Sequence, residues 1–399
     1  MTKTQVTRHD VVVVGARCAG SSTARLLARR GHDVVVVERA ELPSDTLSTH
    51  GIARGGVVQL ARWGLLDRVL ASGAPPVREV MFATDEGDTT RPIKARAGVD
   101  LLVAPRRSVL DSILADDAVA GGVTLRTGTT ATGLLRDDRG RVAGITARTR
   151  DGERLALHAR HVVAADGLRS ATAARLGARE RRSFAADITL FYLYVDSVPW
   201  RGFEFHIAPQ GFAGVFPTHD GAACVWLTRP TALLDSVRTA GARRTQALVA
   251  ALAEVAPGLA ARVRSGRVVS PTRGTVSPPN YVRDASGPGW ALVGDAGYHR
   301  DPITGHGITD AFRDAELLAE ALHETLAGST PERAALEGYG AARDAALRDT
   351  FRLTRELTRF PDPSRFVELQ IELSEALDRE AQTLASRPAP AGLSPATAA

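Results

Sequence analysis

The chain has few cysteines and no long apolar run, the features typical of disulfide-rich and membrane-spanning proteins. It has two cysteines, Cys18 and Cys224, which are too few for a disulfide framework or a cysteine-based zinc site, and we expect no metal. No apolar run approaches the roughly 20 residues that cross a bilayer. The early valine run is too short for the apolar core of a signal peptide. These absences predict a cytoplasmic protein without a membrane span.

Basic residues exceed acidic ones only slightly, at 50 against 45, and no long basic run is present. This balance argues against nucleic-acid binding and favours a small molecule as the partner. A chain of 399 residues is long enough for two domains with sizeable cores. No feature of the sequence specifies an oligomeric state.

The clearest motif is the first strand and the turn that follows it. Four valines end at Gly15, a helix is expected from about Ala19, and a second valine strand at 34–37 ends at Glu38. A turn of this kind leaves N–H groups free at a helix N-terminus, where a pyrophosphate binds. The residues predicted to hold the cofactor here are Gly15, Ala16, Arg17, Cys18, Ala19, Gly20 and Ser21.

The acidic residue at the end of the second strand predicts which dinucleotide binds. Glu38 lies 23 residues beyond Gly15, where a carboxylate can accept hydrogen bonds from both ribose hydroxyls of adenosine. A carboxylate also repels a 2′-phosphate, so Glu38 favours FAD or NAD over NADP, and the adjacent Arg39 is a further candidate cofactor-binding residue. Arg17 stands where the usual G-x-G-x-x-G pattern has its second glycine. The alternative is an ordinary turn of another α/β protein.

Two further regions carry candidate site residues. The polar loop at 43–51 contains His50, which either contacts cofactor or substrate or lies in a helix-capping loop. Strands expected at 77–103 and within 183–275 suggest an antiparallel sheet, with one helix at about 243–255. Its aromatic side chains either line an apolar pocket or only pack a core: Phe191, Tyr192, Tyr194, Phe203, Phe205, Phe212, Phe216 and Trp226.

Three separated motifs agree with one another: the turn at 15–20, Ala165-Asp166-Gly167, and Gly294-Asp295 at the end of a strand. Together they resemble the FAD-dependent monooxygenases typified by para-hydroxybenzoate hydroxylase, within a superfamily that includes geranylgeranyl reductases and flavin halogenases. The resemblance covers residues 9 to about 330. It implies a Rossmann-like α/β FAD-binding domain interleaved with an antiparallel β-sheet substrate domain, followed by C-terminal helices.

The resemblance also implies roles for individual residues. Asp295 would accept hydrogen bonds from the ribityl chain, and the helix start at 302–308 would face the flavin N1–C2=O edge with its N–H groups. The implied FAD-binding residues beyond the first turn are Arg107, Ala131, Asp166, Gly294, Asp295, Pro302, Gly305, His306, Gly307 and Ile308. The candidate catalytic residues are His50, Arg300 and Asp301.

The predicted boundaries follow from these motifs. We expect the FAD-binding domain at 9–76, 100–182 and 276–330, the substrate domain at 77–99 and 183–275, a helical segment at 331–386, and a disordered tail at 387–399. Non-covalent FAD is expected, with NAD(P)H as a transient reductant because no second nucleotide fingerprint is present.

The sequence favours an NAD(P)H-dependent monooxygenase that hydroxylates or epoxidises an apolar or aromatic small molecule. One alternative is a flavin reductase or dehydrogenase of the geranylgeranyl reductase type. Another is a non-catalytic flavin-binding protein. Halogenation is disfavoured because the Trp-x-Trp-x-x-Ile-Pro stretch is missing and the only lysines are Lys3 and Lys94.

Overall fold

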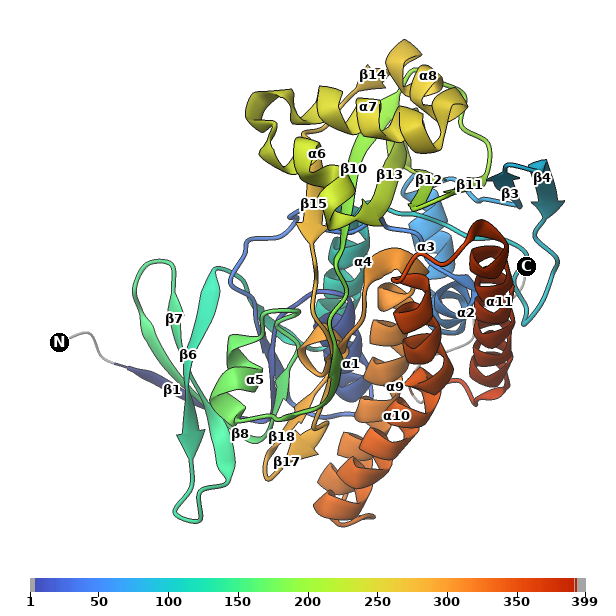
Figure 1. The fold of residues 1–399 in the computed structure, drawn as a ribbon. Helices are drawn as coiled ribbons and strands as arrows, with labels where there is room; N and C mark the ends of the chain where they lie inside the picture. Colours follow the sequence, from blue (N-terminus) through green and yellow to red (C-terminus); the bar gives the residue numbers. More distant parts are fainter. Residues whose placement is uncertain (1–3, 391, 393–399) are drawn as a thin grey trace.

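The computed structural model describes residues 4–390 and 392 and contains two large sheets (Figure 1). The first sheet has a parallel centre of β8, β1, β2 and β5, with β18 parallel to β8. In spatial order its strands are β17 (Ser286–Gly287), β18 (Trp290–Leu292), β8 (Arg154–Ala164), β1 (Gln5–Val14), β2 (Val34–Val37) and β5 (Thr124–Arg126). The antiparallel hairpin of β6 (Thr129–Arg136) and β7 (Val142–Thr149) joins it through β8.

The valine strands are buried on both faces, as strands in the centre of a parallel sheet must be. Val11 and Val13 contribute to the core formed with α1 (Cys18–Ala28), α4 (Arg107–Ala120) and α9 (Gly307–Leu326). Val12 and Val14 point to the opposite side and pack with residues of β7 and β8. The ends of β1 and β18 therefore lie against the starts of the helices that the sequence associates with FAD.

The second sheet is mostly antiparallel. Its strand order is β14 (Arg267–Val268), β10 (Ile188–Asp196), β13 (Ala223–Pro230), β12 (Gly211–Pro217), β11 (Phe203–Ala208), β3 (Glu79–Thr84) and β4 (Gly87–Pro92), with β15 (Arg273–Val276) also on β10. The expectation of a purely antiparallel sheet is wrong at one pair, because β3 runs parallel to β11. These two strands come from distant parts of the chain, so no hairpin constrains their direction.

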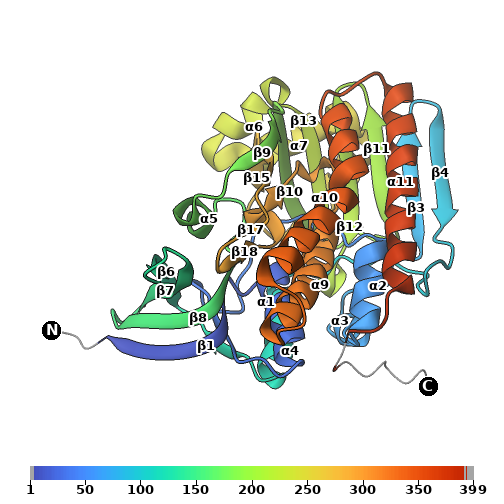
Figure 2. The same cartoon turned by 90° about the horizontal axis from the view of Figure 1, so that it is seen from below.

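Helices cover both faces of this second sheet. On one face lie α6 (Asp235–Thr239), α7 (Arg244–Val255) and α8 (Pro257–Ser265), packed on alternate residues such as Phe191 and Leu193. On the other face α10 (Glu332–Leu357) and α11 (Pro363–Ser386) pack toward Tyr192, Phe203 and Trp226. Figure 2 shows α11 beside β11 and β3. The single expected helix near 243–255 is thus followed by a second one, which begins at Pro257.

Smaller elements connect the two sheets. They are α2 (Arg54–Arg62), α3 (Leu66–Ala71), α5 (Ala171–Leu176), and a three-stranded sheet of β19 (Tyr298–His299), β16 (Asn280–Arg283) and β9 (Glu180–Phe184). The expected strand at 101–103 forms only isolated bridges. None of the helices in the described part of the chain combines the length and apolarity that crossing a bilayer requires. Most of the tail predicted to be disordered lies outside the described residues.

Candidate functional site

The turn between β1 and α1 is built for close approach of the backbone. Gly15 has φ +106°, and a Cβ there would lie 2.5 Å from the carbonyl oxygen of Ala165. A Cβ on Gly20 would lie 1.8 Å from the carbonyl oxygen of Gly15. The first turn of α1 has no side-chain cap and no acidic residue. Its free N–H groups and positive dipole end form a donor set that fits a pyrophosphate.

Asp111, which was not among the predicted site residues, organises the positive charge beside this turn. Its buried carboxylate accepts hydrogen bonds from Arg107 at 3.0 and 3.1 Å and from Arg17 at 3.2 Å. The Cys18 thiol also donates to it, at 3.3 Å, and burial raises the pKa of that thiol. Two guanidinium groups on one carboxylate leave net positive charge next to the α1 N-terminus, which suits a diphosphate.

Hydrogen bonds from backbone N–H groups fix Glu38, at the predicted adenosine end of the site. The Glu38 carboxylate accepts hydrogen bonds from the N–H groups of Ala16 and Ala40, both at 2.9 Å. The carbonyl of Glu38 accepts from the N–H of Thr129, two residues before Ala131 on β6. Arg39 is exposed. The fold therefore brings Glu38 close to the strand that carries Ala131, and their contact with the nucleotide stays a prediction.

The Gly-Asp motif follows β18 and lies against the start of α1. Gly294 has φ +59°, and a Cβ there would lie 2.8 Å from the Cβ of Ala19. The Asp295 carboxylate makes no hydrogen bond to any residue that the structure describes. Burial raises the pKa of Asp295. A half-buried carboxyl group without a partner among the described residues fits the hydroxyl donors of a ribityl chain.

The start of α9 borders open space. The N-cap residue, His306, provides no side-chain cap, and Ile308 is buried behind the first turn. A Cβ added at Gly305 or Gly307 would meet no heavy atom within 4 Å. An uncapped helix start beside open space fits the negatively charged edge of a flavin ring.

Arg300, a predicted catalytic residue, belongs to a buried ion-pair network instead of an open site. It donates to Asp310 at 2.8 Å, and Arg313 donates to both Asp310 and Glu380 at 2.7 Å. Burial by itself would raise the pKa of Asp310, but Arg300 and Arg313 outweigh burial and hold it below the usual value. His306 is 2.7 Å from Glu380, so the network ties α9 to α11.

Metal-ligand side chains meet within this network, yet arginines neutralise them. His306, Asp310 and Glu380 each offer one ligand atom, and these three atoms lie within 4.8 Å of one another. Both carboxylates already accept hydrogen bonds from Arg313. A cation would have to displace a buried guanidinium, so the cluster acts as a structural connection.

Asp301 is buried beside this network with one oxygen unpartnered. Its Oδ1 accepts a hydrogen bond from the N–H of Ile303 at 2.9 Å, while Oδ2 has no partner among the described residues. Burial raises the pKa of Asp301 to about 7. Asp301 can therefore hold a proton near neutral pH, directly before the Pro302–Gly305 loop.

His50 packs against the second sheet. Its Nε2 forms a hydrogen bond with the Tyr194 hydroxyl, and its Nδ1 has no hydrogen-bond partner among the described residues. Burial, followed by the positive charges of Arg107 and Arg106, holds the pKa of His50 well below its usual value. The imidazole is therefore neutral, and its φ of +67° is uncommon for a residue other than glycine.

Asp166, predicted to contact FAD, caps α5. Its carboxylate accepts hydrogen bonds from the N–H of Thr172 at 3.0 Å and from the hydroxyls of Thr172 and Ser170. Ser170 in turn caps the helix by accepting a hydrogen bond from the N–H of Ala173. The Asp166 side chain is therefore occupied locally.

A cavity of about 710 Å³ lies between the second sheet, α11 and the loop before α9. Phe203, Phe205, Phe212, Phe216 and Trp226 line its sheet side, and Leu373 and Leu377 line the α11 side. Pro302, Ile303, Thr304 and Gly305 border it, as do Thr49 and Gly51 on either side of His50. The cavity thus joins the apolar sheet to the loop that precedes the uncapped start of α9.

Three of the predicted aromatic side chains do not line this cavity. Phe191 points to the opposite face of the sheet, where it packs with α7 and α8. Tyr192 and Tyr194 share the cavity face, but the loop around His50 covers them. Sequence reasoning also missed the α11 wall, although the spacing of Phe366, Leu369 and Leu373 indicates an amphipathic helix.

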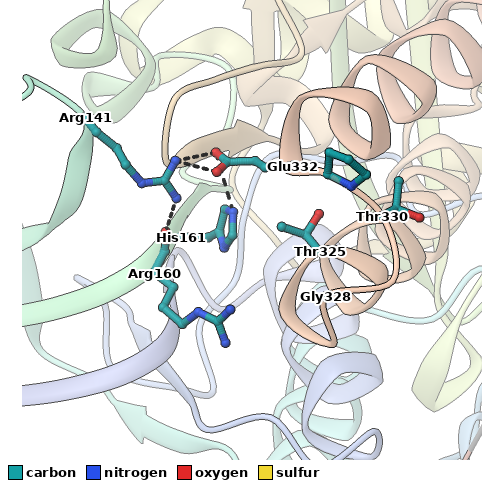
Figure 3. A pocket seen from close by; sticks show the side chains of 8 residues that line it. Arg141, Arg160, His161, Thr325, Gly328, Thr330 and Glu332 are labelled. Carbon is teal, nitrogen blue, oxygen red and sulfur yellow. Dashed lines mark hydrogen bonds and ion pairs between the residues drawn. The ribbon is translucent and has the colours of Figure 1, made fainter.

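A second cavity, of about 540 Å³, is polar and lies where β8, α9 and α10 meet. In Figure 3 the side chains of Arg141 and His161 point toward Glu332 at the start of α10. Arg141 donates to this carboxylate at 2.6 Å, and His161 lies 3.6 Å from it. Glu332 is therefore paired with Arg141, while Arg160 lies 3.6 Å from Asp10 outside the cavity lining.

Comparison with known proteins identifies relatives that match most of the chain. Residues 8–354 match the family described as FAD binding domain. The chain is 27% identical to a digeranylgeranylglycerophospholipid reductase of Methanocella arvoryzae, over 85% of this chain and 83% of that protein. It is 28% identical to a kynurenine 3-monooxygenase of Salinispora arenicola, over 84% of this chain and 76% of that protein.

A solved structure is similar over nearly the whole fold. A mutant of P. aeruginosa PqsL superposes with a TM-score of 0.80 at 22% identity, covering 92% of this chain and 100% of that chain. The match confirms the Rossmann-like domain combined with a sheet domain. The chain belongs to the FAD binding domain family and is an FAD-dependent oxidoreductase that holds FAD non-covalently.

Proposed function

We propose that the protein is an NAD(P)H-dependent monooxygenase that hydroxylates or epoxidises an apolar or aromatic small molecule. One observation carries the proposal: the cavity of about 710 Å³ is walled by aromatic side chains and reaches the Pro302–Gly305 loop. A substrate held there would lie beside the open space at the start of α9. Apolar walls exclude the water that would divert an oxygen-transfer reaction.

Each part of the chain has a distinct task in this proposal. FAD, when bound, supplies the electron transfer and the activation of oxygen. The α1 start, with Arg17 and Arg107, binds the diphosphate, and Asp295 orients the ribityl chain. The uncapped start of α9 stabilises negative charge on the reduced ring. NAD(P)H binds transiently, since the chain carries one nucleotide fingerprint.

The candidate catalytic residues divide by their surroundings. His50 and Asp301 precede segments that line the cavity, and both have an unpartnered polar atom among the described residues. Asp301, whose pKa is about 7, is the better candidate for holding a proton during turnover. We assign Arg300 as a positioning residue, because its contact with Asp310 fixes the start of α9.

A carbon–carbon double-bond reductase is the second candidate, and the relative from Methanocella arvoryzae favours it. The two reactions differ in what the product gains. With ¹⁸O₂, NAD(P)H and a turned-over substrate, the monooxygenase should place one labelled atom in the product. Anaerobic turnover to a product that has gained two hydrogens and no oxygen would overturn the monooxygenase proposal and leave the FAD assignment standing.

A further inference from the structure

The cavity carries unbalanced positive charge on one side. Four basic side chains line it, those of Arg54, Arg91, Lys94 and Arg96, against the single carboxylate of Asp378. Asp378 accepts a hydrogen bond from Arg54 at 3.0 Å and is also paired with Arg96. Neither Arg91 nor Lys94 has a carboxylate within 4.0 Å among the described residues. Two cations at the cavity are therefore left without a protein counter-charge.

The strand register places Arg91 on the cavity side of the sheet. Arg91 on β4 lies directly opposite Val80 on β3, and Val80 pairs with Phe203 on β11. Side chains opposite one another on neighbouring strands share a face. The Phe203 ring lies 4.4 Å from the Phe216 ring, so one row of side chains runs from the charge into the aromatic wall.

The same topology separates the two ends of the cavity. Trp226 lies on β13, and the strand order from there is β12, β11, β3 and β4. Four strand spacings of about 4.8 Å separate Trp226 from Arg91 by roughly 19 Å along the sheet. Aromatic side chains fill the inner part of this distance, Arg91 lies on the edge strand, and Lys94 follows that strand. The cavity is thus apolar at one end and cationic at the other.

Basic residues on an edge strand can also serve to prevent pairing between sheets. That explanation does not account for Lys94, because β4 ends at Pro92 and Lys94 follows it. Nor does it account for Arg91 lining the cavity. Removing the basic residues separates the two explanations. If they only protect the edge strand, their loss causes aggregation and leaves the affinity for small ligands unchanged.

We propose that the substrate is an elongated apolar molecule with an anionic group, a carboxylate or a phosphate, at one end. Arg91 and Lys94 bind the anion at the edge of the sheet, and the apolar body extends along Phe203 and Phe205 toward Trp226. The guanidinium of Arg91 and the ammonium of Lys94 form charge-assisted hydrogen bonds with such a group. This inference rests on the proposed function, because it takes the cavity as the substrate site.

The test uses the full-length protein loaded with FAD and three probes with the same chain: dodecanoate, dodecyl phosphate and 1-dodecanol. Binding is followed by the change in flavin absorbance, and NAD(P)H oxidation is measured in parallel. We expect at least one anion to bind about tenfold more tightly than the alcohol, a difference of about 1.4 kcal/mol. The tighter anion identifies the headgroup. Its affinity should fall as ionic strength rises.

The variant Arg91→Gln with Lys94→Gln should weaken binding of the preferred anion about tenfold and change dodecanol binding less than twofold. A double variant with the same loss of charge, Arg139→Gln with Arg264→Gln, is the control. Both control residues are exposed and lie outside the cavity. The charge reversal Arg91→Glu with Lys94→Glu should weaken binding of the anion further. Thermal melts verify that each variant is folded.

Equal affinity for anion and alcohol, equal weakening by the control variant, or no binding of either anion would overturn the inference. These outcomes are separable from failure of the proposed function. If FAD binds and labelled oxygen enters a neutral substrate only, the monooxygenase proposal stands and the anionic substrate is wrong. If anions bind as expected but turnover adds two hydrogens without oxygen, the substrate class stands and the monooxygenase proposal is wrong.

Discussion

Replacing Gly307 with alanine tests whether the open space at the start of α9 belongs to the flavin. A Cβ at this position would meet no heavy atom within 4 Å, so the protein itself has room for a methyl group. Gly338, within α10, offers the matched control, because a Cβ there also meets nothing within 4 Å. If alanine reduces FAD binding at Gly307 and not at Gly338, a bound group and not the protein itself requires the glycine.

In the protein without FAD, both substitutions should change the free energy of unfolding in the same direction. Alanine is favoured over glycine in a helix by roughly 0.5–1 kcal/mol, and less at the first helical residue, which Gly307 is. With FAD, Gly307→Ala should weaken the contact between the flavin and the first N–H groups of α9. Loss of one or two such hydrogen bonds costs about 1–3 kcal/mol, so the Kd for FAD should rise about tenfold to a hundredfold.

The assay compares both variants with the wild-type protein after removal and re-addition of FAD. Unfolding midpoints of the FAD-free proteins show the helix effect, and titration with FAD gives the Kd. A wild-type Kd for Gly307→Ala would refute the placement of the flavin against α9. An equal rise for Gly338→Ala would also refute it, because the effect would then be a general one.

Three further predictions concern single side chains. The pKa of Asp301 is about 7 in the folded protein, against 3.8 in the unfolded chain, so the folded protein binds this proton more tightly. The free energy of unfolding should therefore fall by at most about 4 kcal/mol as the pH rises from 4 to 7. Asp301→Asn keeps an acceptor for the N–H of Ile303 and should remove this pH dependence of the unfolding free energy, which urea midpoints at pH 5 and 8 measure. An unchanged pH dependence would contradict the raised pKa of Asp301. The Trp226 indole N–H is buried without an acceptor among the described residues, so Trp226→Phe removes an unsatisfied donor and should leave the melting temperature within about 2 °C. A larger fall in the melting temperature would show that packing of the Trp226 ring against Phe212 and Phe216 outweighs the unsatisfied donor. Asp295→Ala should lower FAD occupancy, measured by absorbance of the purified protein, and full occupancy with wild-type affinity would exclude a ribityl contact.

The elements that the sequence predicted well are those whose residues are close together in the chain. The β1–α1–β2 unit follows from two valine runs, a glycine turn and an acidic residue, all within 10–38. The cap of α5 by Ser170 and the start of α11 at Pro363 also depend only on neighbouring residues. In each case neighbouring residues restrict the backbone strongly enough that distant contacts do not change the outcome.

Contacts between distant segments could not be read from spacing. Asp111 reaches Arg17 across 94 positions, and only the i,i+4 pair with Arg107 hinted at its role. Asp166 was assigned to the cofactor from its motif, and its side chain caps α5, so a contact of Asp166 with FAD stays a prediction. The ion pairs of Glu380 with α9 join residues 67 and 74 positions apart.

The amino-acid sequence by itself determined the dinucleotide turn, the two kinds of sheet and the family, because hydrophobic period, glycine position and helix starts act over a few residues. Only the tertiary structure decided which aromatic side chains face the cavity. Phe191 and Phe203 look alike in the sequence, yet helices α7 and α8 cover one and α11 faces the other. It also decided that β3 and β4 join β11 and bring Arg91 to the aromatic wall. Strand pairing between distant segments depends on burial of whole faces, which no local pattern encodes.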